Sequence, residues 1–179
     1  MRGPAPPYAN EGQHALWHVS ENDAIRRFEP HVAATSDRAE PLVWALDTRH
    51  LPLYWFPREC PRACFWACDQ TTPDDMLLLE GAAQVHAVEL AWLERMRRAR
   101  VVAYRLPQEP FEHDGDGFWV SREAVEPLEL IDLGDLLERH IDALIELRFV
   151  PSLWPLWRRV AASTLEFSGI RLRNAQPAK

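Results

Sequence analysis

The sequence predicts an α+β fold in one domain. Three observations favour this class: the apolar runs are short and numerous, the helical segments are small, and the two alternate at irregular intervals instead of forming a regular βαβ array. A chain of 179 residues has the size of one domain and can bury a sizeable core. We therefore expect a domain over residues 14–170, a flexible tail over residues 1–13 and a basic tail over residues 171–179.

Several segments have the length and composition of β-strands. Residues 16–19 form a short apolar run, and residues 42–46 are apolar without alternation, which is typical of a strand covered on both faces. The further candidates are residues 64–68, 85–90, 101–106, 118–121, 128–131 and 145–150. Residues 113–117 have the composition of a tight turn before the run 118–121.

The predicted helices are short and begin at recognisable caps. Ser20 is the expected N-cap of a helix over residues 21–28, with Asn22 or Asp23 as alternatives. Asp47 and Thr48 are expected to cap a second short helix, which Pro57 ends. The other expected helices cover residues 76–79 after a Thr-Pro cap, residues 92–98, the amphipathic segment 134–144 and a terminal helix over residues 153–167.

Charge and hydropathy exclude several classes of protein. The net charge of −7 and pI near 5.5 argue against a broad nucleic-acid surface, which needs clustered cations. Basic residues gather only around residues 95–100 and 158–179, so a local anionic contact or a solvated helix face remains open. The chain contains no run of 18 apolar residues and no secretory pattern, so we expect a cytoplasmic protein without a membrane segment.

Three cysteines recur at intervals of four, at Cys60, Cys64 and Cys68. This spacing places them on one side of either a helix or a strand. Without a CxxC pair and in an apolar stretch, the thiols are expected to pack as free cysteines, with a metal or redox site as the alternative. The sequence also lacks GxGxxG, Walker-type, GxSxG and HExxH motifs, so we expect no bound metal and no doubly wound nucleotide fold.

Two resemblances go beyond these patterns. Residues 16–21, 41–45, 60–62, 119–123 and 164–168 resemble an uncharacterised bacterial family of single-domain proteins without an assigned activity. More distantly, residues 16–131 are similar to small ADP-ribosyltransferase-like proteins, notably rifampin ADP-ribosyltransferase and the RNA phosphotransferases that remove a splicing phosphate. This second resemblance implies a split mixed or antiparallel sheet with flanking short helices and a C-terminal helix, and NAD as cofactor.

The resemblance implies a role for the first strand. The sequence His18-Val19-Ser20 stands where the transferase-like families carry His-x-Thr or His-His-Val on their first strand. In those families the histidine bonds a ribose hydroxyl of NAD, and the neighbouring backbone and hydroxyl hold the nicotinamide amide. A neutral imidazole suits this role because it offers one donor and one acceptor. The alternative is a buried histidine that bonds the protein's own backbone.

Two further elements of the resemblance lie later in the chain. Tyr54, in the short helix after the strand 42–46, stands where the family stacks an aromatic ring on the nicotinamide, with Trp44 or Trp55 in reserve. The string 118–127 resembles the late family strand, but Phe118 occupies the position where many transferases keep a catalytic glutamate.

A carboxylate is needed near that position to stabilise the developing oxocarbenium ion. Asp116 or Asp114 before Phe118, or Glu123 after it, can take its place. Arg122 is a candidate for binding a pyrophosphate, as are Arg26 and Arg27, because a guanidinium matches phosphate oxygens in pairs.

Three functional hypotheses follow. The first is an NAD-consuming transferase in which His18, Tyr54, Asp116 and Glu123 are catalytic and in which His18, Ser20, Trp44, Tyr54 and Arg122 bind the nucleotide. The second is an inactive module of the same fold that binds a nucleotide-type small molecule or a protein. The third is an interaction domain whose terminal helix, with Trp154, Trp157 and Phe167, docks a partner or a second copy of the chain. The sequence does not indicate an acceptor substrate.

Overall fold

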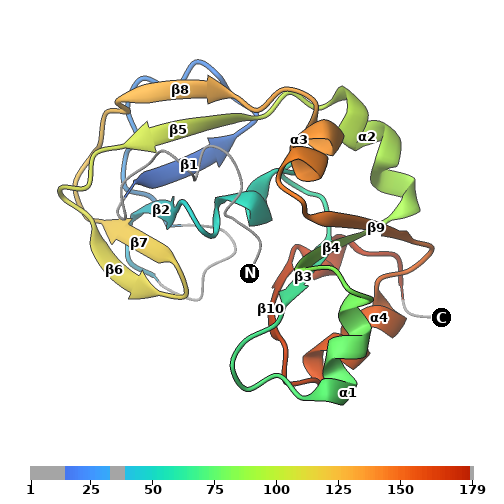
Figure 1. The fold of residues 1–179 in the computed structure, drawn as a ribbon. Coiled ribbons are helices and arrows are strands. Elements are labelled where there is room, and N and C mark those ends of the chain that lie inside the picture. Colours follow the sequence, from blue (N-terminus) through green and yellow to red (C-terminus); the bar gives the residue numbers. More distant parts are fainter. Residues whose placement is uncertain (1–14, 33–38, 178–179) are drawn as a thin grey trace. The chain divides into compact units, whose positions relative to one another are not determined.

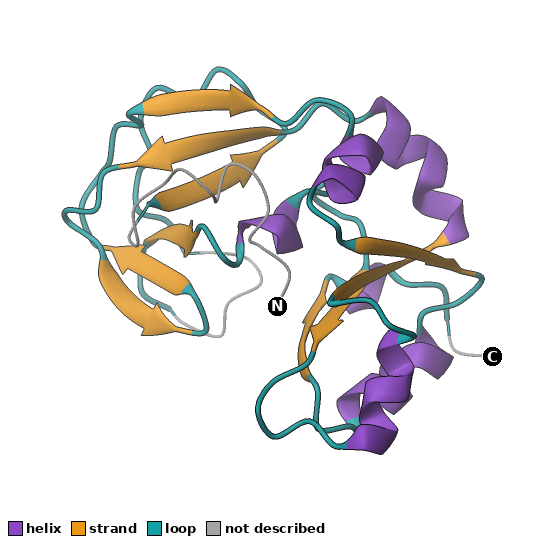
Figure 2. Cartoon of the chain, in the orientation of Figure 1, coloured by secondary structure: helices purple, strands orange, loops and turns teal. Residues whose placement is uncertain are grey.

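The computed structural model describes residues 15–32 and 39–177 and confirms the α+β class (Figure 1). It contains a six-stranded and a four-stranded sheet with short helices (Figure 2). By their contacts, the described residues divide into two compact units: unit 1 holds residues 56–99 and 135–177, and unit 2 holds residues 15–32, 39–55 and 100–134. The segment 14–170 expected as one domain therefore contains two units, and the tail expected over residues 1–13 lies outside the described residues.

Unit 2 is built on an antiparallel sheet in the order β6-β7-β2-β1-β5-β8. Its strands are β1 (Leu16–Ser20), β2 (Val43–Asp47), β5 (Val102–Leu106), β6 (Glu112–Gly115), β7 (Phe118–Ser121) and β8 (Glu129–Asp132). The 3-10 helix η2 (Leu51–Tyr54) follows β2. In the register, Leu16 lies opposite Asp47 on one side and Leu106 on the other. This register decides which side chains share a face of the sheet.

The two faces of this sheet bury different clusters. Leu16 and Tyr104 belong to a buried cluster together with Phe28, Val43, Ala45, Val102, Leu106, Phe111 and Val125. On β1, successive side chains point to opposite faces, so Trp17 faces away from this cluster. Trp17 is fully buried, and its indole Nε1 donates to Thr48 Oγ1 at 2.9 Å.

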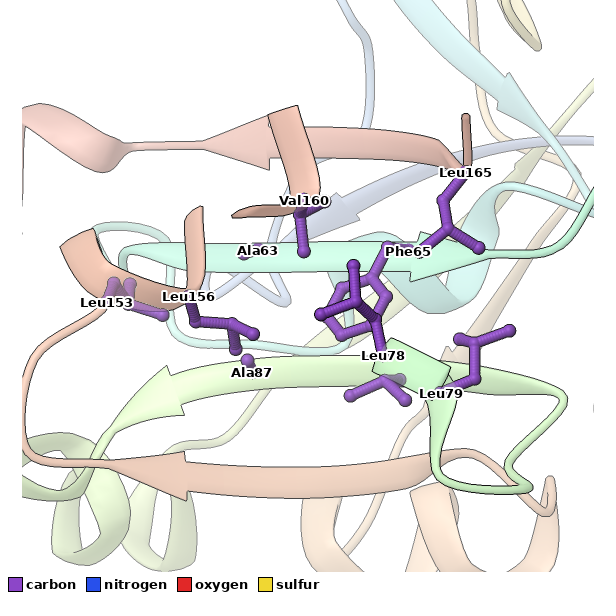
Figure 3. Packing of buried hydrophobic residues seen from close by; sticks show 10 residues of the cluster. Ala63, Phe65, Leu78, Leu79, Ala87, Leu153, Leu156, Val160 and Leu165 are labelled. Carbon is purple, nitrogen blue, oxygen red and sulfur yellow. The ribbon is translucent and has the colours of Figure 1, made fainter. Parts of the chain in front are cut away.

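Unit 1 contains the sheet β10-β3-β4-β9, in which only the β4–β9 pair is parallel. The strands are β3 (Arg62–Trp66), β4 (Gln84–Glu89), β9 (Glu146–Val150) and β10 (Glu166–Ile170). The helices are α1 (Pro73–Met76), η3 (Leu77–Leu79), η4 (Leu90–Trp92), α2 (Leu93–Arg98), α3 (Leu136–Asp142), α4 (Trp154–Ala161) and η5 (Leu172–Asn174). Figure 3 shows the buried side chains of Leu156 and Val160 from α4 beside Phe65 and Ala87 of the sheet. The other buried members of this core are Ala63, Leu78, Leu79, Val85, Leu153 and Leu165.

The caps predicted for two helices differ in outcome. Thr72 caps α1, because its side chain accepts from the Asp75 amide and Pro73 occupies the first turn, as predicted. The helix predicted over residues 21–28 is wrong. Ser20 Oγ accepts from the Asn22 amide and Asn22 Oδ1 accepts from the Ala24 amide, both at 3.0 Å. These side chains therefore form local turns that compete with a helix.

The C-terminal prediction also needs correction. The helix expected over residues 153–167 ends at Ala161, and residues 166–170 form strand β10 instead. Ser163 Oγ donates to the Val160 carbonyl at 2.7 Å and closes the helix end, after which the chain pairs antiparallel with β3. Residues 171–177 are bonded to unit 1, since the Gln176 amide donates to the buried Glu89 carboxylate. The predicted strand 64–68 is shifted to Arg62–Trp66.

Candidate functional site

All of the predicted site residues lie in unit 2. Strand alternation places His18 and Ser20 on the same face as Leu16, while the pairing of Trp17 with Leu46 places Trp44 on the opposite face. Phe118 pairs with Leu46 and therefore shares the face of Trp44. The structure thus puts the two polar residues of β1 on one face of the sheet and the rings of Trp44 and Phe118 on the other.

His18 bonds within the fold. Its Nδ1 lies 2.9 Å from the Trp44 carbonyl oxygen, so this nitrogen carries the proton and donates. The His18 ring lies 4.7 Å from the ring of Phe28, a residue joined to Val125 by a β-bridge. Ser20 Oγ is bonded to the Asn22 amide. The His18 imidazole and the Ser20 hydroxyl, to which the resemblance assigns NAD binding, therefore contact the segment 21–28 and β2.

Tyr104 forms hydrogen bonds with the segment 21–28, which contacts His18 through Phe28. Its hydroxyl donates to the Asn22 carbonyl at 2.8 Å and accepts from the Ile25 amide at 3.0 Å. We expect Tyr104→Phe to lower the free energy of unfolding by about 1–2 kcal/mol, because two backbone groups lose their partner. Urea unfolding followed by tryptophan fluorescence measures this loss. Ile25→Val, which keeps both bonds, is the control, and equal stabilities of wild type and Tyr104→Phe would contradict the role of the hydroxyl.

An aromatic cluster of Trp44, Tyr54 and Phe118 forms on the other face. The Phe118 ring lies edge-on to both others, with centroid distances of 6.1 Å to Trp44 and 6.5 Å to Tyr54. All three side chains are half-buried, so their rings combine packing with access to solvent. Trp55, the reserve candidate, is fully buried and belongs to the interior. The structure therefore brings together two of the predicted aromatic residues and adds Phe118.

At the end of β2 lies the pair Asp47–His50, which sequence reasoning missed. Asp47 Oδ1 accepts from the His50 amide at 2.9 Å and lies 2.7 Å from His50 Nδ1. Burial alone raises the pKa of Asp47, but the hydrogen bonds and charge of His50 outweigh burial and hold that pKa below its usual value. A carboxylate that bonds both the amide and the ring fixes the orientation of the imidazole.

The turn between β6 and β7 connects the pair to the cluster. Gly117 has a φ of +77°, and a Cβ at this position would collide with the His50 imidazole, so the ring lies directly against the glycine. The Gly117 carbonyl accepts a hydrogen bond from the Asp47 amide at 2.9 Å. Phe118, the next residue, contacts Tyr54. His50 and Tyr54, four residues apart, therefore contact two consecutive residues, Gly117 and Phe118. The spacing Asp-x-x-His at the end of a strand was the sequence signal that could have revealed the Asp47–His50 pair.

The predicted charged residues lie outside this arrangement. Arg122 binds two carboxylates, with Nε 2.7 Å from Glu40 Oε1 and Nη1 3.0 Å from Glu112 Oε2. These two bonds raise the pKa of its exposed guanidinium. Glu123 has an exposed side chain and bonds Ser121 Oγ through its backbone. Asp116 is exposed in the left-handed conformation, directly before Gly117.

The cysteines are free thiols. Cys60 and Cys64 are buried in unit 1, and burial raises the pKa of both thiols to about 12. Such thiols are unreactive at neutral pH. Among residues 15–32 and 39–177, no three His, Cys, Asp or Glu side chains come together in a way that could hold a metal ion.

Comparison with known proteins adds one match. A family model described as a family of unknown function, DUF6886, covers residues 17–175. The chain belongs to DUF6886. This confirms the expectation of an uncharacterised family, and the match includes β1, the aromatic cluster, the Asp47–His50 pair and most of unit 1 in this DUF6886 protein. No curated protein and no solved structure matches the chain significantly. Within the described part of the chain, every helix is too short or too polar to cross a membrane.

Proposed function

We propose that this DUF6886 protein is a binding module for a nucleotide-type small molecule, with NAD as the first ligand to test. The observation that carries the proposal is the aromatic cluster of Trp44, Tyr54 and Phe118, in which Phe118 follows Gly117, the residue that lies against the oriented imidazole of His50. Flat, half-buried rings provide a stacking surface for a base or for the cationic nicotinamide ring. A few oriented polar groups beside apolar rings are typical of ligand sites.

The geometry favours binding over ADP-ribosyl transfer. The transferase hypothesis needs His18, Ser20 and Tyr54 around one ligand, but the β1 residues lie on the opposite face from the cluster. Arg122 already binds Glu40 and Glu112. Catalysis of glycosidic cleavage depends on groups preorganised around one reacting centre. Binding by the cluster requires only the residues that lie together.

Ligand binding can be tested by thermal unfolding and tryptophan fluorescence in millimolar NAD, nicotinamide mononucleotide or adenosine monophosphate. We expect at least one of them to raise the melting temperature, because a ligand that binds only the folded state stabilises it. Tyr54→Leu should weaken binding about fivefold through the loss of a stacking contact of roughly 1 kcal/mol. Phe167→Leu, an exposed aromatic residue of unit 1, is the matched control and should bind as the wild type does.

Two results would overturn this proposal. The first is an unchanged melting temperature and fluorescence with all three compounds. The second is release of nicotinamide from NAD that stops in His18→Ala, since that result supports the transferase hypothesis instead.

A further inference from the structure

A chain of hydrogen bonds runs through the interior of unit 1. His140 Nδ1 lies 2.6 Å from the Leu136 carbonyl oxygen, His140 Nε2 lies 3.0 Å from His86 Nδ1, and His86 Nε2 lies 2.8 Å from Gln84 Nε2. Both histidines are fully buried. They come from different elements, since His86 is on β4 and His140 on α3.

The partners at each end determine where the protons lie. A carbonyl oxygen only accepts, so His140 Nδ1 carries a proton and the Nε2 of the neutral ring accepts from His86 Nδ1. His86 Nε2 then accepts from the Gln84 amide. Every nitrogen in this arrangement has one suitable partner, and both rings are neutral. With Gln84 Nε2 donating to His86 Nε2, an added proton on His140 Nε2 would place two N–H groups against each other and break the His86–His140 hydrogen bond.

The surroundings oppose a positive charge on either ring. Arg62 of β3 is buried, and its charge acts on both histidines, while Arg139 of α3 acts on His140. Three further neighbours are uncharged: Cys64 and Leu147 lie opposite His86 in the register, and the Phe56 ring lies 4.9 Å from His140. Helix α2 contributes buried Met96, whereas its Glu94 pairs with exposed Arg97 and Arg98. Cys60, also buried near Phe56, is a neutral thiol.

Helix α3 depends on this contact. It has seven residues, and its only buried side chains are those of Leu136 and His140. A helix of this length is unstable by itself in water. We propose that the His86–His140 pair is a proton-sensitive latch that holds α3 on the four-stranded sheet, so that protonation of the pair releases the helix. The latch lies wholly in unit 1 and is independent of the binding function proposed for unit 2.

The direction of the pH effect follows from the two states. Burial is the main cause that lowers the pKa of His140 to about 4 and that of His86 well below its usual value, whereas released rings titrate normally near 6.5. The docked state therefore binds fewer protons, and its stability falls as the pH drops from about 6.5 toward 4. At about pH 5, His140 alone should raise the population of released α3 about 30-fold.

Hydrogen exchange of the full chain tests the latch. After correction for intrinsic exchange rates, we expect amides of α3 to lose about 30-fold protection between pH 7.5 and about pH 5 relative to those of α4. The double variant His86→Leu/His140→Leu removes both rings and should show no such loss, whereas the exposed-histidine control His31→Gln should behave as the wild type does. Equal protection of α3 and α4 at both pH values, or the same loss in the double variant, would overturn the proposal.

A second measurement applies if the double variant does not fold. Nitrogen-15 spectra of the wild-type imidazoles should show both rings protonated at Nδ1 and neutral in the docked state. Their titration should coincide with the loss of the α3 amide signals. Titration of either ring near its usual pKa with α3 unchanged would contradict the latch.

Discussion

Replacement of Trp17 by alanine should lower the free energy of unfolding by roughly 3–5 kcal/mol, the range for a large aromatic side chain removed from a packed core. Trp17 is fully buried on β1, the strand between β2 and β5, and its indole donates to Thr48 Oγ1. The change leaves a cavity and removes this bond. Urea unfolding followed by far-UV circular dichroism measures the loss, and we expect the variant to unfold at a lower urea concentration.

The conservative variant Trp17→Phe separates packing from hydrogen bonding. It keeps most of the buried ring and removes the indole donor, so a loss of about 1–2 kcal/mol is expected. Trp154→Ala is the contrasting control, because this half-buried indole on α4 bonds the Gln176 carbonyl near the end of the described chain. A Trp17→Ala variant as stable as Trp154→Ala would show that the β1 side chain is not part of a packed core.

Replacement of Gly117 by alanine should displace His50 and weaken the candidate site. The added Cβ collides with the imidazole, and the backbone has a φ of +77°, which alanine rarely adopts. We expect the variant to lose about 2–4 kcal/mol of stability, from backbone strain together with overpacking. Ligand binding to the aromatic cluster should weaken as well, because the turn that carries Phe118 must move.

Gly115→Ala is a matched control in the same hairpin. Gly115 also has a positive φ, +104°, but a Cβ there meets nothing within 4 Å. The Gly115→Ala variant therefore introduces the backbone strain without the collision. The stability difference between the two variants, expected to be about 1–3 kcal/mol, measures the contact with His50. Equal effects of the two substitutions would mean that the imidazole does not lie against Gly117.

The sequence predicts single strands better than their arrangement. The apolar runs around residues 43–47 and 102–106 are strands within one residue of the expected positions, because a buried strand leaves a local apolar signal. Which residues of two neighbouring strands share a face depends on the pairing register, and no local sequence pattern determines that register. For this reason the resemblance could place His18 and Tyr54 in one site, whereas the register puts His18 on the face opposite Phe118, the residue that Tyr54 contacts.

The missed elements have related causes. Ser20 and Asn22 are good helix caps and equally good turn residues, and tertiary contacts of Phe28 and Tyr104 select the turn. Strand β10 follows α4 after a short turn, and its pairing with β3 joins residues 100 positions apart in the sequence, such as Trp66 and Glu166. The Asp47–His50 pair had a local signal, but the His86–His140 bond spans 54 residues and had none.

Because the chain completes unit 2 at residue 134 before it supplies the second stretch of unit 1, unit 1 begins at residue 56 but cannot be completed until all of unit 2 has been synthesised. On a ribosome, strands β3 and β4 emerge before β9 and β10 and remain without these partners until residues 146–170 are synthesised. The outer edges of this strand pair stay unpaired during that interval, when they can pair with another nascent chain. Chaperone demand during translation should therefore come from the first stretch of unit 1.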